Sequence, residues 1–447
     1  MNGAEALIQS LSESGVDVCF ANPGTSEMQL VAAIDGQKNM RAVLGLFEGV
    51  VTGAADGYGR MADKPALTLL HVGAGLANGC ANLHNAKRAY SPVLNMVGDH
   101  ASYHLQYDAP LTSDVAGVAR PFSDWLATSK SSDDLVKVGT DALRAALQFP
   151  GQVATFIAPA DHAWDEANLT LNTEPPEAPR TSQSKVEAAI NALGHDGPTA
   201  ILLGARALRE DALAMAGRIA DGTGAKLISE TFSTRLQRGA GRVAPERIPY
   251  FGELAADFLK NFEQVIIVGT TPPVSFFAYP DKPSWLLPDG VEPVILATPH
   301  ECPLDALSRT IDGLKEKGVD IADRPKNVQA SMIPPVDDGP LHPVAVGGVL
   351  AELMPDNAII SDGAATAGLA IFPMTAGTKH HDWMMLTGGA IGQGLPVGIG
   401  AAIACPDRKV ICLEADGSAM YTIQSLWTMA RENLDITTVI INNGSYA

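Results

Sequence analysis

The chain has 447 residues, 46% of them hydrophobic, which is enough for about three globular domains with buried cores. Its 31 Lys and Arg residues are outnumbered by 50 Asp and Glu residues, giving a net charge of −19 and no basic cluster, so neither a nucleic acid nor an anionic membrane surface is expected as a partner. No apolar run reaches the roughly 18 residues that span a bilayer, and the N-terminus lacks a signal-peptide pattern, so we expect a cytoplasmic protein.

Short apolar runs alternate with helix-like stretches along the whole chain. The first third of the chain has such runs at 16–20, 43–47, 66–71, 93–97 and 153–158, with helix-like stretches at 4–14 and 49–61. The same pattern continues at 199–203, 226–229, 265–268 and 294–297, and again at 358–361, 409–414 and 436–441. This alternation predicts parallel sheets with crossover helices.

Two Pro-rich acidic segments, residues 174–179 and 333–340, divide the chain and are typical of extended linkers. We therefore predict an α/β protein of three doubly wound parallel-sheet domains, with boundaries at 1–170, 185–325 and 340–447. The last predicted strand ends close to Ala447 and has no helix after it. We expect the third domain to be incomplete at its C-terminus.

Asp416 and Asn443 each follow a predicted buried strand, at 409–414 and 436–441. A helix of roughly 16 residues between the strands would carry the chain back about 24 Å, and the second strand would return about 20 Å. Both side chains should therefore reach the carboxyl edge of one sheet, where open α/β sheets bind ligands. A carboxylate and an amide oxygen there suit Mg²⁺, although each residue taken singly is also typical of an ordinary turn.

The spacing of these residues resembles the thiamine-diphosphate signature of the acetolactate synthase and benzoylformate decarboxylase family. Asp416-Gly417-Ser418 is followed, 27 positions after Asp416, by Asn443, the second residue of an Asn-Asn pair. The resemblance implies that the Asp416 and Asn443 side chains and the Ser445 carbonyl hold Mg²⁺ against the cofactor diphosphate. It also implies that Gly417, Ser418 and Asn443 contact the cofactor.

Residues 387–396 form a glycine-rich stretch ahead of 397–404, a helix-like stretch with few large side chains. Close helix–strand packing accounts for the small residues of the second half. The first half resembles the family's glycine-rich loop, in which Gly389 would contact the cofactor and Ile391 would be the apolar wedge that bends it. The bent cofactor brings its aminopyrimidine nitrogen beside the reactive thiazolium carbon.

Glu48 opens the stretch 48–60, directly after the predicted strand at 42–47. An acid at this place could simply be favoured by the helix dipole. The whole stretch, with its Ala-Asp-Gly-Tyr sequence, resembles the family helix that carries a glutamate. The resemblance implies that Glu48 hydrogen-bonds N1′ of the pyrimidine ring, a role that requires a protonated carboxyl.

Two further loops resemble the family, at 22–25 after the first strand and at 70–75 after the third. Thr25 corresponds in position to the serine that touches substrate in benzoylformate decarboxylases. His71 corresponds to their active-site histidine, whereas a lone histidine at a strand end is otherwise more often structural. The loop match therefore favours a catalytic assignment for both residues.

Other features of the first segment carry less information. Residues 73–79 do not fit a dinucleotide-binding loop, because Asn78 stands where the last glycine of GxGxxG is needed. His100 and His104, after the strand at 93–97, are further candidates for a substrate pocket.

The central segment departs from both branches of the family. Benzoylformate decarboxylases place another histidine beyond the fourth strand of this domain, whereas residues 270–279 here contain none. The same stretch lacks the Arg-containing loop that is typical of flavin-binding acetolactate synthases. We therefore do not expect bound FAD, and proton delivery to the product should differ from that in benzoylformate decarboxylases.

The resemblance covers the whole chain and gives the three domains their roles: pyrimidine-binding, central and diphosphate-binding, in that order. It implies a thiamine-diphosphate- and Mg²⁺-dependent enzyme that decarboxylates small 2-oxo acids or joins them to a second carbonyl compound. In family members the glutamate and the metal motif act from different subunits. A homodimer or homotetramer is therefore implied.

Three functions stay open at this point. Thr25 and His71 favour a decarboxylase for an aryl or branched 2-oxo acid, and the missing central histidine weakens that assignment. A carboligase of the acetolactate synthase type is the second. The third is a catalytically silent relative that binds the cofactor in a regulatory or structural role, suggested by Ala415 where the family usually has a glycine before the aspartate.

Overall fold

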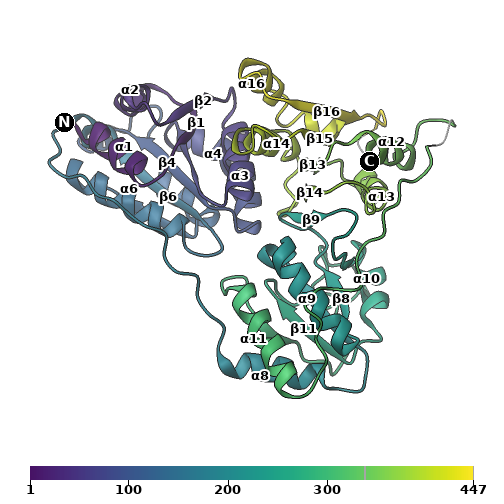
Figure 1. Ribbon diagram of the computed structural model, residues 1–447. Coiled ribbons are helices and arrows are strands. Elements are labelled where there is room, and N and C mark those ends of the chain that lie inside the picture. Colours follow the sequence, from purple (N-terminus) through teal and green to yellow (C-terminus); the bar gives the residue numbers. More distant parts are fainter. Residues whose placement is uncertain (337–338, 446–447) are drawn as a thin grey trace. The chain divides into compact units, whose positions relative to one another are not determined.

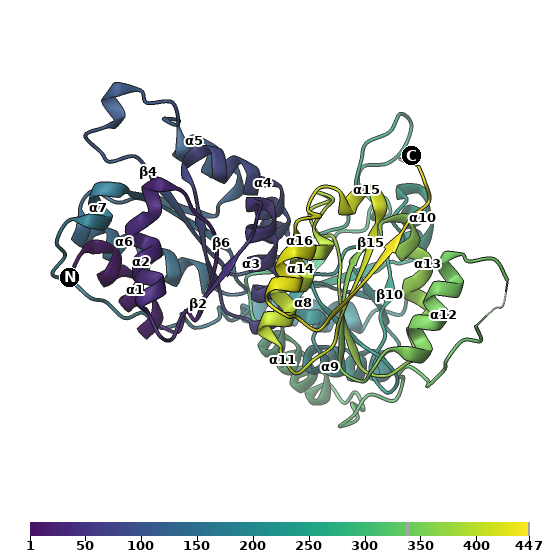
Figure 2. The same ribbon diagram turned by 90° about the horizontal axis from the view of Figure 1, so that it is seen from above.

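The computed structural model describes residues 1–336 and 339–445, and Figures 1 and 2 show it in two views. The described chain forms two compact units. The first comprises residues 1–177, 359–365 and 386–445, and the second comprises 178–358 and 366–385. Residues 337–338 of the second predicted linker, and 446–447 at the chain end, lie outside the described residues.

The first unit contains a six-stranded parallel sheet in the order β2-β1-β3-β4-β6-β5, with helices on both faces as the alternating apolar runs predict (Figure 1). Its strands are β1 (Val18–Asn22), β2 (Arg41–Leu44), β3 (Ala66–Leu70), β4 (Val93–Asp99), β5 (Trp125–Thr128) and β6 (Val153–Pro159). One face carries α1 (Gly3–Glu13), α2 (Met28–Gly36), α6 (Ser132–Ala146) and α7 (Ala160–Trp164). The other carries α3 (Glu48–Ala62), α4 (Val72–Arg88) and α5 (Val115–Ala119).

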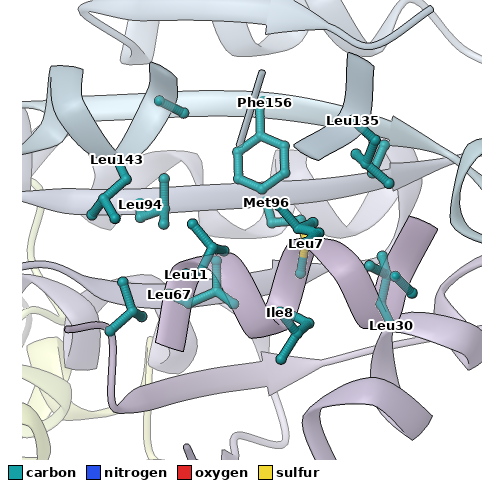
Figure 3. Close-up of a cluster of buried hydrophobic side chains, with 14 of the residues drawn as sticks. Leu7, Ile8, Leu11, Leu30, Leu67, Leu94, Met96, Leu135, Leu143 and Phe156 are labelled. Atoms are coloured by element: carbon teal, nitrogen blue, oxygen red, sulfur yellow. The ribbon is translucent and has the colours of Figure 1, made fainter. Parts of the chain in front are cut away.

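The core on the α1 face is apolar and fully buried (Figure 3). Leu7 and Leu11 of α1 pack with Phe156 of β6 in one cluster, and all three side chains are at most 1% exposed. The helix begins with a capping box, in which the Asn2 side chain accepts the Glu5 N–H at 2.8 Å and the Glu5 carboxylate accepts the Asn2 N–H at 3.0 Å. Capping and burial together fix α1 on the sheet.

The first unit also contains parallel strands in the order β16-β15-β13. The elements of this part are β13 (Ala358–Gly363), α14 (Gly394–Ala404), β15 (Val410–Ala415), α15 (Asp416–Ala419), α16 (Ser425–Arg431) and β16 (Ile436–Ile441). The first residue of β13, Ala358, belongs to the second unit. Ala415 pairs with Ile441, so the chain leaves both strands at the same edge. The predicted meeting of the segments after β15 and β16 is therefore confirmed.

The single long helix predicted between β15 and β16 is wrong. The chain forms two short helices, because residues 420–424 make tight turns between α15 and α16. The Tyr421 N–H donates to the Ser418 carbonyl at 3.2 Å, and the Thr422 hydroxyl donates to the Gly392 carbonyl at 2.7 Å. This side-chain bond to a distant loop anchors the break.

The second unit contains the five-stranded parallel sheet β10-β8-β7-β11-β12. Its strands are β7 (Thr199–Leu203), β8 (Lys226–Ser229), β10 (Glu246–Arg247), β11 (Gln264–Val268) and β12 (Val294–Ala297). Helices α8 (Gln183–Leu193), α9 (Glu210–Thr223) and α11 (Pro303–Glu316) bury one face, and α10 (Gly252–Leu259) buries the other. The unit also holds α12 (Pro343–Leu353), α13 (Thr366–Met374) and the antiparallel pair β9 (Leu236–Arg238) and β14 (His381–Met384).

Three sheets of parallel strands with helices packed on them confirm the predicted fold class. The residue boundaries of the three domains stay a prediction. The two Pro-rich segments contain no helix or strand among their described residues. None of the helices in the described part of the chain is long and apolar enough to cross a membrane.

One buried carboxyl group ties together the carboxyl ends of three strands of the second unit. Glu230, directly after β8, accepts hydrogen bonds from the Ala205 N–H at 2.9 Å and the Thr270 hydroxyl at 2.8 Å. Gly204 makes room for it, because a Cβ there would lie 2.5 Å from the Glu230 carboxyl. Burial raises the pKa of Glu230 to about 7.

This raised pKa predicts a pH-dependent stability. The folded protein holds the Glu230 proton more tightly than the unfolded chain does. The contribution of this proton to the free energy of unfolding is therefore complete below about pH 4.5 and is lost as the pH rises through 7. Glu230→Gln should therefore be the more stable protein above pH 7, by up to about 3 kcal/mol, and should match the wild type at pH 4.5. Urea unfolding at both pH values measures this, and the exposed Glu263→Gln is the matched control. Equal pH profiles for the wild type and Glu230→Gln would contradict the prediction.

Candidate active site

Glu48 is the first residue of α3 and is buried. Its Oε2 accepts a hydrogen bond from the Asn78 side chain of α4 at 2.9 Å. Gly75 packs against the same carboxyl group, because a Cβ at that position would lie 3.0 Å from Glu48 Oε1. The carboxyl is thus held at a helix N-terminus, where the helix dipole acts on it.

His71 directly follows β3 and lies beside a buried acid, Glu27, that sequence reasoning did not identify. Its Nδ1 is 2.7 Å from Oε2 of Glu27, and the same oxygen accepts the Gly24 N–H at 2.7 Å. Gly24 lies flat against the imidazole, since a Cβ there would come within 2.4 Å of the ring. An Nδ1–H donated to Glu27 would leave Nε2 as the nitrogen that exchanges protons with a ligand.

The structure brings Glu48, His71 and Thr25 to one sheet edge. Strands β1 and β3 are neighbours, Thr25 follows β1 in an exposed turn, and His71 follows β3. Gly75 lies between Glu48 and His71, because a Cβ added to Gly75 would be 3.0 Å from the Glu48 carboxyl oxygen and 3.3 Å from the Cβ of His71. A carboxyl group and a histidine therefore lie on either side of Gly75, with the Thr25 hydroxyl in a turn at the same sheet edge, and such groups can serve acid–base chemistry.

Asp416 and Asn443 follow β15 and β16 at the carboxyl edge of the third sheet. Asp416 is the first residue of α15 and is half-buried, with Gly417 and Ser418 after it. The Asn443 side-chain oxygen accepts the Ser445 N–H at 2.9 Å. No cluster of three or more His, Cys, Asp or Glu side chains that could hold a metal occurs in the described chain, so a cation here would need amide and carbonyl oxygens as well.

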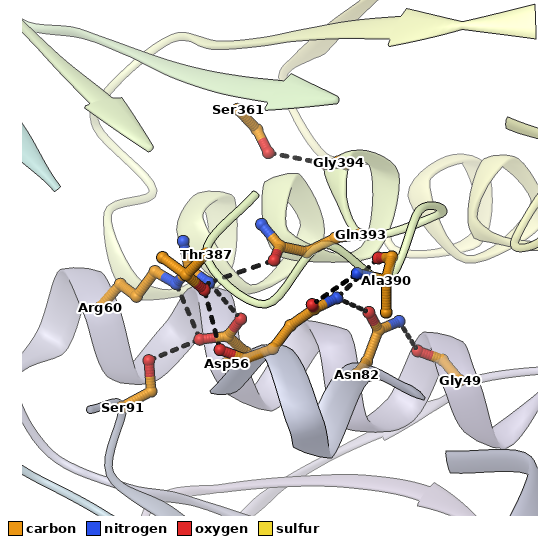
Figure 4. A network of polar contacts seen from close by, with 11 residues as sticks. Gly49, Asp56, Arg60, Asn82, Ser91, Ser361, Thr387, Ala390, Gln393 and Gly394 are labelled. Atoms are coloured by element: carbon orange, nitrogen blue, oxygen red, sulfur yellow. Dashed lines mark hydrogen bonds and ion pairs between the residues drawn. The ribbon is translucent and has the colours of Figure 1, made fainter. Parts of the chain in front are cut away.

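The glycine-rich loop ahead of α14 is held by α4 (Figure 4). The Asn85 side chain donates to the Ala390 carbonyl at 2.8 Å and accepts the Ala390 N–H at 3.2 Å. Gly389 and Gly392 have φ of +77° and +94°, values that favour glycine. The partly buried Ile391 between them is therefore presented by a loop of fixed shape.

A buried ion pair of α3 holds the same loop from a second direction. Arg60 donates to Asp56 through Nε at 2.8 Å and Nη2 at 2.6 Å, and both side chains are completely buried. The Arg60 guanidinium also reaches the Thr387 hydroxyl at 3.1 Å and the Gln393 side-chain oxygen at 3.3 Å, and Ser91 donates to Asp56 at 2.5 Å (Figure 4). The pair is thus satisfied by several partners, as a buried charge requires.

Glu414 lies two residues before Asp416 and was also not identified from the sequence. Its side chain is fully buried, and Oε2 accepts the Leu395 N–H of α14 at 3.1 Å. Gly363 and Gly394 leave space for it, because a Cβ at either position would lie within 2.3 Å of its oxygens. Burial raises the pKa of Glu414 to about 8.

Helices α3 and α14 cross at a distance that only glycine permits. A Cβ on Gly57 would lie 2.0 Å from the Val397 carbonyl oxygen, and one on Gly400 would lie 1.9 Å from the Ala54 carbonyl oxygen. Gly398 packs instead on Cys412 of β15. The helix–strand packing predicted for 397–404 therefore holds for Gly398, whereas Gly400 serves a contact between helices.

His100 and His104 follow β4, the neighbour of β3, so they lie at the same sheet edge as His71, with ring centroids 5.5 Å from each other. Among the described residues neither is hydrogen-bonded to His71. No hydrogen bond or ion pair among the described residues joins the Glu48 and His71 group to Asp416 or Asn443. Residues 73–79 lie in the first turns of α4.

Two of the missed residues carried a weak sequence signal. Glu27 lies two positions after Thr25 in the same turn, and Glu414 lies on β15 two positions before Asp416. An acid two positions from a candidate catalytic residue is itself a candidate for the same site. Their hydrogen-bond partners, the His71 ring and the Leu395 N–H, could not be predicted from the sequence.

Comparisons with known proteins agree with this picture. Models of the N-terminal and C-terminal TPP-binding domains of thiamine pyrophosphate enzymes match residues 1–118 and 363–447. The protein named "Putative acetolactate synthase large subunit IlvX" from Mycobacterium tuberculosis is 48% identical over 446 residues, which cover 100% of this chain and 85% of that protein. Benzoylformate decarboxylase of Pseudomonas aeruginosa is 27% identical, covering 99% of this chain and 86% of the relative.

The fold is shared with solved structures. A thiamine diphosphate-dependent 4-hydroxybenzoylformate decarboxylase from Rhodococcus jostii superposes with a TM-score of 0.85 at 23% identity, covering 100% of this chain and 87% of that one. Benzoylformate decarboxylase from Polynucleobacter necessarius gives a TM-score of 0.86 at 19% identity, covering 100% and 86%. At these identities the likeness concerns the fold.

The crossing of α3 and α14 predicts a strong effect of one methyl group. Gly400→Ala should lower the free energy of unfolding by more than about 2 kcal/mol, because the new Cβ would press on the Ala54 backbone carbonyl. Gly36→Ala at the end of α2, where nothing lies within 4 Å, is the matched control and should have little effect. Urea unfolding followed by circular dichroism measures both. A loss below about 0.5 kcal/mol for Gly400→Ala would refute the close crossing.

Proposed function

The chain belongs to the family of thiamine pyrophosphate enzymes that includes acetolactate synthases and benzoylformate decarboxylases, and from this membership we propose that it decarboxylates 2-oxo acids at the Glu48–His71 site. The meeting of Glu48, His71 and Thr25 at one sheet edge is the observation that carries the proposal. Acid–base groups at a sheet edge suit a reaction in which CO₂ leaves and a proton takes its place.

The residues after β15 and β16 fit Mg²⁺ and a diphosphate. Asp416 offers a carboxylate, Asn443 an amide oxygen and Ser445 a backbone carbonyl, which are hard oxygen donors of the kind Mg²⁺ takes beside phosphate. Gly417 and Ser418 lie in the short helix α15 at the same edge, and Gly389 and Ile391 lie on the loop held by Asn85. Bound thiamine diphosphate would supply the electron sink for the loss of CO₂.

The chain's own side chains would orient the reactants and move protons. Glu48, fixed by Asn78 at the start of α3, would hydrogen-bond a ring nitrogen of the cofactor. His71, fixed through Nδ1 by the buried Glu27, would hold or deliver a proton at Nε2 next to the substrate. Thr25, exposed in the turn that ends at Glu27, would contact the substrate carboxylate.

Carboligation of the acetolactate synthase type is the second candidate. The relative at 48% identity carries an acetolactate synthase name. Residues 270–279 also contain no histidine, so the chain lacks at that position the residue expected of the decarboxylase branch. A site poor in proton donors would favour addition of a second carbonyl compound over protonation.

We do not include FAD in the proposed cofactor set. Glu230 occupies the carboxyl edge of the central sheet and already accepts the Ala205 N–H, the type of backbone donor that would otherwise face a nucleotide phosphate. The hydrogen bond to Glu230 leaves this N–H unavailable to a phosphate.

We also propose that the enzyme is a homodimer or homotetramer in the cytoplasm. Apolar side chains are exposed on the single chain near the proposed metal edge, among them Met420, Tyr421 and Trp427. Such a patch is typical of an interface. Light scattering on the purified protein measures the assembly, and cell fractionation measures the location.

A panel of 2-oxo acids tests the function directly. With thiamine diphosphate and Mg²⁺ present, we expect CO₂ release together with an aldehyde product. Release of CO₂ with a hydroxyketone product would support carboligation instead. No CO₂ from any aliphatic or aryl 2-oxo acid, despite cofactor binding, would support the catalytically silent relative.

Asp416→Ala should abolish metal-dependent binding of thiamine diphosphate, because the proposed metal set loses its only carboxylate. Titration calorimetry with and without Mg²⁺ measures the affinity. Asp435→Ala, at the opposite end of β16 and paired with Lys409, is the control and should bind as the wild type does. Undiminished binding by Asp416→Ala would remove Asp416 from the metal site.

Glu48→Gln should fold and bind the cofactor but lose catalysis by orders of magnitude, because an amide cannot give up a proton to the ring nitrogen. Exchange of the cofactor C2 proton, followed by NMR, isolates this step from the rest of the reaction. Glu13→Gln, an exposed change at the end of α1, should exchange at the wild-type rate. If Glu48→Gln did so too, the assignment would be wrong.

A further inference from the structure

Glu414 joins the two segments of the first unit that the proposed function assigns to the cofactor. It lies on β15 and is completely buried, and its Oε2 accepts the Leu395 N–H at the start of α14 at 3.1 Å. The Ser418 hydroxyl of α15 donates to the same carboxyl group. Glu414 therefore contacts both the end of the glycine-rich loop and the segment that follows Asp416.

Ser418 extends this connection to the middle of the glycine-rich loop. Its hydroxyl oxygen accepts the Gly392 N–H at 2.9 Å. A hydroxyl has one hydrogen to donate, and here the Glu414 carboxyl group accepts it. The hydrogen bonds thus run in one direction, from the Gly392 N–H through Ser418 to Glu414, and they begin at the residue directly after Ile391.

Two glycines make room for the Glu414 carboxyl group. A Cβ on Gly363 of β13 would lie 2.3 Å from Oε1, and one on Gly394 would lie 2.2 Å from Oε2. The Gly394 carbonyl accepts the Ser361 hydroxyl at 2.7 Å (Figure 4). The carboxyl group therefore fits closely between β13 and the start of α14, and it has little room to move.

Stability alone does not account for this carboxyl group. Its Oε1 is buried and has no hydrogen-bond partner among the residues that the structure describes. A buried oxygen without a partner lowers the free energy of unfolding, and an apolar side chain of similar size would avoid that loss. Departures of this kind are typical of functional positions. The unpaired oxygen therefore points to a role in the site.

The glycine-rich loop is held on either side of Ile391 along the chain. Asn85 of α4 holds Ala390 through two hydrogen bonds, at 2.8 and 3.2 Å. Gly392 is held by Ser418 through its N–H and by the Thr422 hydroxyl through its carbonyl, at 2.7 Å. A displacement of the segment after Asp416 would therefore reach Ile391 through Gly392.

We propose that Glu414 is a positioning residue that couples the metal edge to the loop carrying Ile391, acting through Ser418 and the Leu395 N–H. The proposal rests on the proposed function, since it takes Asp416 as a ligand of Mg²⁺ and Ile391 as a contact of the cofactor. Residues 416–418 would become fixed when Mg²⁺ and a diphosphate bind. Through Glu414 and Ser418 the loop would be fixed with them, so less order would be lost when the cofactor ring binds.

Amide hydrogen exchange of the full chain tests the coupling without any turnover. The probe is inorganic pyrophosphate with Mg²⁺, which can occupy the metal edge but has no ring to contact Ile391. We expect the probe to slow exchange in the peptide that covers residues 389–396 by about fivefold or more, because the side chains that hold this peptide become fixed. In Ser418→Ala the slowing should be lost. Unchanged exchange in the wild type with pyrophosphate bound would overturn the proposal.

Variants of Glu414 separate positioning from a structural role. Glu414→Leu should weaken the Mg²⁺-dependent binding of thiamine diphosphate about tenfold or more, measured by calorimetry, because hydrogen bonds to a carboxyl group are lost. Glu414→Gln should stay within about threefold of the wild type, because its amide oxygen can accept the Leu395 N–H and its amide nitrogen can donate to Ser418. An equal loss in the Gln and Leu variants would contradict the hydrogen-bonded role.

Thr428→Val is the matched control, a buried polar change in the same part of the chain. The Thr428 hydroxyl of α16 donates to the Leu44 carbonyl at 3.0 Å, away from the glycine-rich loop. The change should lower the free energy of unfolding and leave the affinity for thiamine diphosphate unchanged. A loss of affinity equal to that of Glu414→Leu would show that lowered stability alone explains the effect and would overturn the proposal.

A double-mutant cycle shows whether Glu414 acts through Ser418. The loss of affinity in the double variant Glu414→Leu, Ser418→Ala should be smaller than the product of the two single losses, because both changes break one connection. Single losses that multiply would overturn the proposal, as would wild-type affinity in Glu414→Leu. If Glu414→Leu does not fold, the exchange measurements on the wild type and Ser418→Ala decide.

The outcome can be told apart from that of the proposed function. A chain that shows the coupling but releases no CO₂ from any 2-oxo acid would refute the proposed decarboxylation alone. A chain that decarboxylates 2-oxo acids without the coupling would refute the role of Glu414 alone. A chain that binds neither pyrophosphate nor thiamine diphosphate would refute both.

Discussion

The crossing of α3 and α14 is the contact on which the rest of the first unit depends. Gly57 and Gly400 let each helix lie against a backbone carbonyl of the other, at separations where any Cβ would overlap an oxygen. Glu48 begins one helix, and the glycine-rich loop with Ile391 leads into the other. A shift of one helix against the other would therefore change the separation of Glu48 and Ile391, and the tight packing of glycines resists such a shift.

The buried Asp56–Arg60 pair acts on the same contact. Removing two charges from water costs several kcal/mol, and their attraction offsets this only with good geometry and further hydrogen bonds. Both conditions hold here, since the bond is bidentate and Ser91, Thr387 and Gln393 supply the further partners. A pair built this way gains little net stability, so its value lies in fixing the register of the loop ahead of α14 against α3.

The sequence allowed the parallel sheets and the edge shared by β15 and β16 to be predicted, because strand alternation and parallel geometry decide both. It could not predict the hydrogen bond from His71 to Glu27, which joins residues far apart in the chain through the closeness of β1 and β3. Nor could it predict that residues 420–424 break the helix, because the reason is a bond from Thr422 to Gly392. Contacts between distant segments are set by packing, which periodicity does not encode.

The backbone at Ala415 bears on the choice between an active and a silent protein. A glycine would be indispensable before Asp416 if the chain adopted a left-handed conformation there, and its replacement would then distort the metal edge. Ala415 instead has φ of −74° and ψ of 146°, extended values that any residue adopts, and it caps α15 without strain. The conformation at Ala415 therefore gives no backbone reason to expect a distorted metal edge. What remains to separate the candidate functions is the proton chemistry around His71, where the buried Glu27 fixes the ring.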